Sequence, residues 1–261
     1  MSIPALMIAA PQGRSGKTTV AIGLCAALRQ RGLKVKPFKK GPDYIDPSWL
    51  TAASGMSCGN LDPYMFDETT LKQAFMRGCD DMDIAVIEAS MGLYDSPGED
   101  GSGSSAWLAR LLKVPVILVV NSARMARSAA AMVSGYINFE PDTKITGVIL
   151  NNVAGQRHRD KLVNAIEKHC GIPVLGCIPP DKGLALKERH IGIVPLIVTL
   201  TGPVWNFVSP SGPFGTLRWV CGTFLCHVGL IFWPFALLLF WNLFRRTYWL
   251  EWIKMAALVA F

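Results

Sequence analysis

The sequence lacks the features typical of a secreted protein, of a structural zinc site and of a nucleic-acid-binding protein. Its seven cysteines form no C-x-x-C pair and no zinc-type pairing with histidine, so we expect free thiols in a reducing compartment. The first apolar stretch, residues 5–10, is too short for a signal peptide and runs into a glycine loop. The basic excess includes no clustered arm, which argues against nucleic acid as a partner. These absences favour a cytoplasmic protein.

Charge is nearly missing from the last quarter of the chain, which also holds most of the eight tryptophans. The charged residues after position 195 are Arg218, Arg245, Arg246, Glu251 and Lys254. We therefore expect a globular domain over 1–195 and an apolar tail over 196–261. Within the tail, 220–244 is free of formal charge and long enough to cross a bilayer. A membrane segment and a shifted reading frame after a deletion both fit this composition.

Before the tail, short apolar runs alternate with longer amphipathic stretches. The apolar runs predict strands at 5–10, 35–38, 84–87, 116–120, 145–150 and 174–178. Several are apolar at every position, as strands covered on both faces are. The stretches between them predict helices at 17–31, 68–77, 104–112, 124–137 and 160–169. This alternation predicts an α/β fold with a doubly wound, mainly parallel sheet that binds ligands at the carboxyl ends of its strands.

A phosphate loop, P-Q-G-R-S-G-K-T-T, follows the first predicted strand at residues 11–19. Its glycines let backbone N–H groups turn inward around phosphate oxygens, and the following helix adds its positive N-terminal end. Lys17 would reach the β- and γ-phosphates, and the Thr18 hydroxyl would join a Mg²⁺ shell. Pro11 stands where the strict pattern has Gly. The residues expected to bind ATP are Gly13, Arg14, Ser15, Gly16, Lys17, Thr18 and Thr19.

Acidic residues follow two later strands of the predicted sheet. The segment K-K-G-P-D-Y-I-D-P, residues 39–47, carries two lysines and two carboxylates, and its glycine and prolines predict a rigid loop. Glu88 closes the third predicted strand. An acid at that position beside a phosphate loop is where a carboxylate of the Mg²⁺ shell belongs. The sequence therefore predicts a nucleotide site with acidic neighbours.

Several segments together resemble the amidotransferase-type cobyrinic acid a,c-diamide synthases. Besides the two loops above, the resemblance is carried by N-L-D-P at 60–63, I-E-A-S-M-G-L-Y-D at 87–95, G-V-I-L-N-N-V-A-G-Q-R-H-R-D-K-L at 147–162 and E-R-H-I-G-I-V-P at 188–195. It runs collinearly over residues 4–195. It implies a synthetase domain like dethiobiotin synthetase that amidates two peripheral acetates of a corrin ring. ATP would phosphorylate each carboxylate, and ammonia would displace the phosphate.

The resemblance also implies roles for individual residues. Thr18 and Glu88 are the expected neighbours of Mg²⁺, and Asn151 falls where related synthetases bind adenine, unless it is a turn residue. Either Lys39 or Lys40 would neutralise the substrate carboxylate, and the residues alone do not choose between them. The expected catalytic residues are Lys17, Asp43, Asp46 and Glu88. The expected substrate contacts are Lys39, Lys40, Asp43, Tyr44 and Asp46.

The glutaminase domain of the resembled family, with its Cys, His and Glu, has no counterpart after Pro195. We therefore expect ammonia, or ammonia from glutamine, to be supplied from elsewhere to the chain and its tetrapyrrole substrate. Two other functions stay open: a membrane-associated P-loop switch ATPase of the partitioning or division-site type, and a non-catalytic truncated product. The switch ATPases carry a signature lysine where this chain has Gln12. Membrane contact through 220–244 and a homodimer are open as well.

Overall fold

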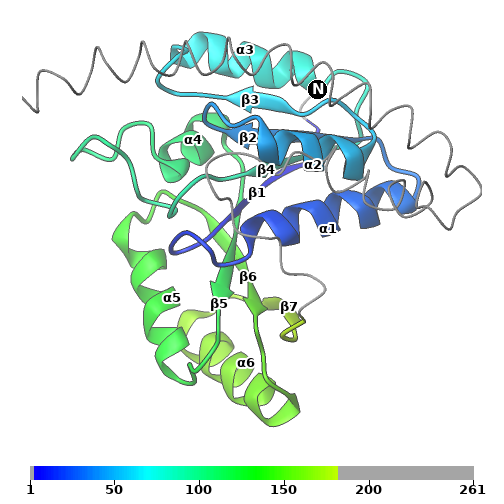
Figure 1. Ribbon diagram of the computed structural model, residues 1–261. Coiled ribbons are helices and arrows are strands. Elements are labelled where there is room, and N and C mark those ends of the chain that lie inside the picture. Colours follow the sequence, from blue (N-terminus) through cyan, green and yellow to red (C-terminus); the bar gives the residue numbers. More distant parts are fainter. Residues whose placement is uncertain (1–2, 182–261) are drawn as a thin grey trace, which may run out of the picture. The chain divides into compact units, whose positions relative to one another are not determined.

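The computed structural model describes residues 3–181, in which strands and helices alternate (Figure 1). In chain order the elements are β1 Ala5–Ala9, α1 Lys17–Gln30, β2 Val35–Lys40, α2 Ile45–Ser54, β3 Gly59–Leu61, α3 Glu68–Gly78, β4 Ile84–Glu88, α4 Ser105–Leu112, β5 Val116–Asn121, α5 Ser128–Phe139, β6 Ile145–Asn151, α6 Gln156–Cys170 and β7 Val174–Ile178. None of the helices within 3–181 has the length and apolar character needed to cross a bilayer. The predicted tail, 196–261, and the stretch 220–244 lie outside the described residues.

All seven strands join one parallel sheet, in the order β3-β2-β4-β1-β5-β6-β7. The central strand β1 pairs with β4 on one side and with β5 on the other. Strands β2 to β4 therefore lie on one side of β1, and β5 to β7 lie on the other side. This arrangement confirms the predicted doubly wound α/β fold. It also places the segment after β1 at the centre of the ligand-binding edge.

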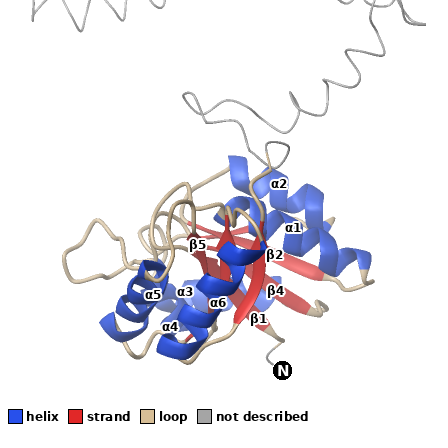
Figure 2. Cartoon of the chain, turned by 90° about the horizontal axis from the view of Figure 1, so that it is seen from below, coloured by secondary structure: helices blue, strands red, loops and turns tan. Residues whose placement is uncertain are grey.

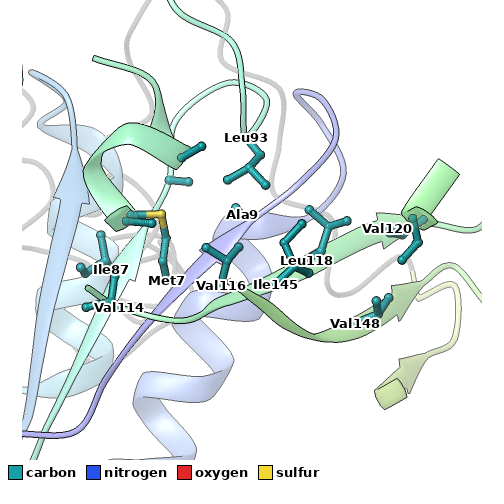
Figure 3. Packing of buried hydrophobic residues seen from close by; sticks show 14 of the residues in the cluster. Met7, Ala9, Ile87, Leu93, Val114, Val116, Leu118, Val120, Ile145 and Val148 are labelled. Atoms are coloured by element: carbon teal, nitrogen blue, oxygen red, sulfur yellow. The ribbon is translucent and has the colours of Figure 1, made fainter. Parts of the chain in front are cut away.

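Both faces of the sheet are covered by helices. Successive residues of a strand point to opposite faces, and apolar residues of β1 are buried on both. Met7 and Ala9 of β1 belong to the larger apolar cluster (Figure 3). This cluster also includes residues of α3, α4, α5 and α6. Ile8 of β1 belongs to a second cluster that includes Val20 of α1 and Leu50 of α2. The helices accordingly form two layers around the strands (Figure 2). Each fully buried aliphatic side chain contributes about 1.5–3 kcal/mol to folding.

Three elements of the first half differ from the sequence-based expectation. Strand β2 ends at Lys40 and helix α2 begins at Ile45, so the expectation of a rigid loop over 39–47 was wrong for its first two and its last three residues. Pro47 is the third residue of α2, where a missing N–H removes no intrahelical hydrogen bond. The short strand β3 ends at Leu61, inside the segment 60–63 that was expected to be a turn.

The helices of the second half also begin at other residues than expected. Helix α5 begins at Ser128 rather than at 124, because Arg124 has a left-handed backbone with φ of 60°. Helix α6 begins at Gln156, four residues before the expected 160. It ends at Cys170 before Gly171, whose left-handed φ of 67° is typical of a helix C-terminus.

Candidate functional site

The phosphate loop leads from β1 into α1 through a left-handed glycine. Gly16 has φ of 96°, and a Cβ there would lie 2.4 Å from Asn151 Nδ2. Within the loop, Ser15 Oγ donates a hydrogen bond to the Gln12 carbonyl at 2.9 Å. Asn151, at the end of β6, donates from Nδ2 to the Ser15 carbonyl at 3.1 Å. The loop is therefore held both from within and by the neighbouring half of the sheet.

The side chain of Lys17 lies inside this loop and contacts backbone oxygens. Its Nζ donates to the Met91 carbonyl at 2.6 Å and to the Gln12 carbonyl at 3.4 Å. Burial lowers the pKa of Lys17, and the Lys39 ammonium lowers it further, while nearby carboxylates including Glu88 oppose this shift. Lys17 is thus positioned at the start of α1 by two backbone carbonyl oxygens, which an anionic phosphate can replace as its partners.

A cluster of charges lies beside the phosphate loop because of strand register. Lys39 of β2 and Glu88 of β4 are directly paired, so both side chains leave the same face of the sheet, toward α1 and α2. Lys39 Nζ lies 3.1 Å from Glu88 Oε1 and 2.6 Å from Asp46 Oδ2. From α1, Thr18 Oγ1 donates to Glu88 Oε1 at 2.5 Å. We call Thr18, Lys39, Asp46 and Glu88 the acid–lysine cluster.

Burial and neighbouring charges shift the pKa values of the titratable groups in this cluster. Glu88 is fully buried, and burial raises the pKa of its carboxyl; the Asp46 carboxylate adds to the rise, while Lys39 and Thr18 oppose it. Burial alone would lower the pKa of Lys39, but Glu88 and Asp46 outweigh burial and raise it. The ammonium form of Lys39 is therefore firmly held by its two carboxylate partners.

One oxygen of the cluster lacks a hydrogen-bond partner among the described residues. It is the buried Glu88 Oε2. A buried carboxylate oxygen beside a threonine hydroxyl and a phosphate loop suits a hard cation such as Mg²⁺, which prefers oxygen ligands. Residues 3–181 contain no group of three or more acidic, cysteine or histidine side chains that could hold a metal ion.

The two neighbouring lysines of β2 are separated by the sheet. Lys40 follows Lys39 and therefore points to the opposite face, where it is equally buried. Burial lowers the pKa of Lys40, and the Asp62 carboxylate opposes this shift. The structure thus places Lys39 with the phosphate loop and Lys40 near Asp62, on the other side of β2.

Between β2 and α2, Asp43 caps the helix and Tyr44 exposes its ring. Asp43 Oδ1 accepts hydrogen bonds from the backbone N–H groups of Ile45 at 2.8 Å and Asp46 at 3.3 Å, which satisfies the start of α2. Tyr44 is 73% exposed. Asn60 Nδ2 donates to the Asp43 carbonyl at 2.5 Å and ties this segment to β3. Asp46 thereby contacts Lys39 in the acid–lysine cluster, while the Tyr44 side chain is largely exposed.

The other predicted nucleotide-binding residues line the loop or the first turn of α1. Gly13 and Arg14 are exposed at the tip of the loop, and Arg14 has a left-handed φ of 58°. Ser15 is buried, and Thr19 is half-buried in α1. The structure therefore brings Lys17, Thr18, Lys39, Asp46 and Glu88 together. Lys40 points to the opposite face of β2, and Tyr44 is largely exposed.

The sequence patterns did not point to three groups at this site. The Met91 carbonyl that holds Lys17 is a backbone atom, to which no residue pattern points. Asp95 Oδ2 accepts from the Gly92 N–H at 2.9 Å and fixes the loop after β4; its place in the segment 87–95 was the available signal. Tyr136 of α5 donates its hydroxyl to the Pro11 carbonyl at 2.8 Å and lies in no motif.

Among curated proteins, the chain is similar to a,c-diamide synthases. The chain is 47% identical over 200 residues to cobyrinate a,c-diamide synthase of Methanosarcina acetivorans, covering 75% of this chain and 40% of that protein. It is 46% identical over 196 residues to hydrogenobyrinate a,c-diamide synthase of Streptomyces coelicolor, covering 75% of this chain and 40% of that protein. The chain thus spans about 40% of the length of these relatives.

Solved structures with a similar fold are distant in sequence. The signal recognition particle receptor FtsY from Elizabethkingia anophelis aligns with a TM-score of 0.51 at 16% identity, covering 72% of this chain and 63% of that one. Chloroplast FtsY from Physcomitrella patens aligns with a TM-score of 0.50 at 19% identity, covering 70% and 64%. These similarities support the P-loop α/β fold alone.

A protein-family comparison covers nearly all of the described residues. Residues 6–193 match the family described as CbiA, the CobQ/CobB/MinD/ParA nucleotide binding domain. The match begins in β1 and includes the phosphate loop and the acid–lysine cluster. The chain therefore belongs to the CobQ/CobB/MinD/ParA nucleotide-binding domain family.

Proposed function

We propose that this chain is an ATP-dependent carboxylate–amine ligase that amidates the a and c side chains of cobyrinic acid or a related tetrapyrrole such as hydrogenobyrinic acid. The observation that carries the proposal is the acid–lysine cluster beside the phosphate loop, in a chain whose similar relatives are named for this reaction. The proposed reaction uses ATP, and we place it in the cytoplasm.

ATP is proposed to bind along the loop between β1 and α1, with its triphosphate against the N-terminus of the helix. Lys17 leaves the Met91 carbonyl for the phosphate oxygens, because an anion is a stronger partner for an ammonium than a carbonyl is. Thr18 and the free Oε2 of Glu88 are the groups that would hold Mg²⁺. Bound there, Mg²⁺ would neutralise charge on the transferring phosphoryl group. Asn151 is proposed to lie near adenine.

The chemistry has two displacement steps. An oxygen of the substrate carboxylate attacks the γ-phosphorus of ATP, the bond to the bridging oxygen breaks, and ADP leaves with an acyl phosphate formed. The nitrogen of ammonia then attacks the acyl carbon, phosphate leaves, and the nitrogen loses a proton to give the amide. The acyl phosphate is needed because a free carboxylate is a poor acyl donor. Fixed cations stabilise the charge that develops on the phosphoryl oxygens.

The substrate carboxylate has to lie within reach of the γ-phosphate. The proposed substrate contacts are therefore the residues from the end of β2 to the start of α2, at this edge of the sheet, including the exposed ring of Tyr44. They are Lys39, Lys40, Asp43, Tyr44 and Asp46. Asp43 acts in this proposal through α2, because its carboxylate caps the helix that carries Asp46.

The proposal is tested with the full chain, cobyrinic acid, ATP, Mg²⁺ and ammonium. Mass spectrometry should detect products with one and two amidations, with one ADP and one phosphate formed per amide. Reactions without ATP, and reactions of the Lys17→Ala variant, serve as controls. ATP hydrolysis that is stimulated by anionic lipid vesicles and never accompanied by amide formation would instead support a membrane-associated switch ATPase.

A further inference from the structure

The ammonium of Lys39 lies where two buried carboxylates converge. Its Nζ contacts Asp46 Oδ2 at 2.6 Å and Glu88 Oε1 at 3.1 Å, and all three side chains are at most 5% exposed. The same nitrogen donates to the Ala89 carbonyl at 3.5 Å. Two carboxylates that converge in this way form a pair of oxygen ligands that would suit a divalent cation. A side chain of the protein already supplies a positive charge between them.

The buried charges of the site are balanced without a metal. Lys17 and Lys39 contribute two positive charges, and Asp46 and Glu88 contribute two negative charges. A free divalent cation would add two uncompensated positive charges in a region of low dielectric, where such an excess is costly. A triphosphate supplies the negative charge that compensates for a metal. The balance therefore favours joint entry of metal and nucleotide over entry of the metal alone.

The orientation of Glu88 fits this order of binding. Lys39 and Thr18 both engage Oε1, whereas Oε2 has no partner among the described residues. One carboxylate oxygen is thereby available to a metal that arrives with phosphate. The Asp46 oxygen on the other side of the ammonium is occupied. Lys39 thus blocks capture of a cation between the two carboxylates and leaves a single contact for the metal of a nucleotide complex.

We propose that Lys39 is an intrinsic counter-ion that excludes free divalent cations from the Asp46–Glu88 pair, so that the metal enters only together with a nucleotide. This inference rests on the metal position in the proposed function. Its role is distinct from the predicted contact with the substrate carboxylate, because it operates before any substrate is bound. It makes Lys39 a positioning residue whose effect is measurable in the absence of turnover.

The test is a titration of the full chain with Mn²⁺ in the absence of nucleotide, followed by electron paramagnetic resonance. The wild-type chain should bind Mn²⁺ weakly. Lys39→Met should bind it at least about tenfold more tightly, because two buried carboxylates lose their counter-ion. Lys39→Arg should behave like the wild type, because it restores the positive charge. The double variant Lys39→Met/Asp46→Asn should lose the gain, because only one carboxylate remains.

A second measurement covers the case in which Lys39→Met is poorly folded. Its thermal unfolding midpoint should rise with Mn²⁺, and that of the wild-type chain should not, because binding to the folded state alone is stabilising. Equal Mn²⁺ affinity in wild type and Lys39→Met, or a variant that Mn²⁺ does not stabilise, overturns the inference. Binding of Mn²⁺ with ATP to the wild-type chain is measured in parallel, and its failure would count against the proposed function instead.

Discussion

At the scale of single residues, Lys17 allows the phosphate-loop assignment to be tested. Its ammonium is buried and held by the Met91 carbonyl. Because the side chain contributes charge rather than apolar packing, its removal should leave the fold intact. Lys17→Ala should therefore lower ATP hydrolysis at least about 100-fold, the usual cost of losing a preorganised charge at a transferring group.

The measurement is phosphate release at saturating Mg²⁺, with circular dichroism to confirm the fold. The exposed Lys34, mutated to alanine, is the matched control for loss of a lysine. If Lys17→Ala hydrolysed ATP as fast as the control variant, the assignment of residues 11–19 as a phosphate loop would be wrong.

A buried thiol in α1 predicts how the protein responds to alkaline pH. Burial raises the pKa of Cys25 from 9.0 to about 12, and Glu88 adds to the shift. The folded state then binds more protons than the unfolded state between these values, so its stabilisation is complete below pH 9 and is lost as the pH rises toward 12. The loss is about 1.4 kcal/mol per pH unit for this fully buried group.

Urea unfolding of the wild-type chain and of Cys25→Ala, at pH 8 and at pH 10, measures this effect. The free energy of unfolding should fall less steeply with pH in the variant, even though the smaller side chain lowers stability at pH 8. Parallel pH dependences would mean that the thiol does not titrate in this range.

Residue identity indicated which side chains the structure brings together at the candidate site. It did not indicate which of them contact one another. Lys17, Thr18 and Glu88 follow from the loop pattern and from the acid that closes a strand, and the structure brings them together. The choice between Lys39 and Lys40 depends on which face of β2 each one occupies. That face is decided by the register between β2 and β4, which pairs residues about fifty positions apart and leaves no local pattern.

At the scale of elements, the start of α1 depends on one glycine. Gly16 combines a left-handed φ of 96° with a contact that leaves no room for a Cβ beside Asn151. Gly16→Ala should therefore cost about 1–2 kcal/mol of backbone strain and break the bond from Asn151 to the Ser15 carbonyl. We expect ATP affinity to fall at least about tenfold.

Gly23, in the exposed middle of the same helix, is the matched control. A Cβ there meets no atom within 4 Å, so Gly23→Ala should stabilise the protein by about 0.5–1 kcal/mol without affecting ATP binding. Calorimetric titration with ATP and thermal unfolding separate the two variants. Equal ATP affinity in both would show that the loop tolerates a shift of Asn151.

Elements were predictable where a continuous apolar pattern or a cap marked them. Helix α3 begins after Asp67, whose side chain accepts from the Thr70 N–H, and strand β7 has the expected bounds. Helix α2 was missed because the glycine and prolines around its start are typical of loops, although Pro47 is tolerated in a first turn. Strand β3 is three residues long, too short for an alternating pattern to show.

At the scale of the whole molecule, the nitrogen donor is the property easiest to test. Because the glutaminase motif was not identified in residues 196–261, the nitrogen donor is tested on a protein of these 261 residues. We expect ammonium to support amidation by the full chain and glutamine to give none. At fixed total ammonium the rate should rise with pH, because free ammonia is the nucleophile, until alkaline loss of stability intervenes.

Mass spectrometry of reactions with each nitrogen source over a range of pH measures both effects. A reaction without cobyrinic acid shows how much ATP is hydrolysed without amide formation. Amide formation with glutamine and purified chain would contradict the expectation and would require a glutaminase in the sequence that its motifs do not reveal.

The position of β1 in the middle of the sheet has a consequence for biosynthesis. Among the described strands, the central strand Ala5–Ala9 is synthesised first, yet its two neighbours are Ile84–Glu88 and Val116–Asn121. The strand made first therefore has both partners only after residue 121 has left the ribosome. The bond from Asn151 to Ser15 forms later still. Such long-range pairing slows folding and leaves unpaired strand edges open to aggregation during translation. Of the described strands, the one that leads into the phosphate loop is thus made first, yet its contacts are completed only after most of the other elements have been made.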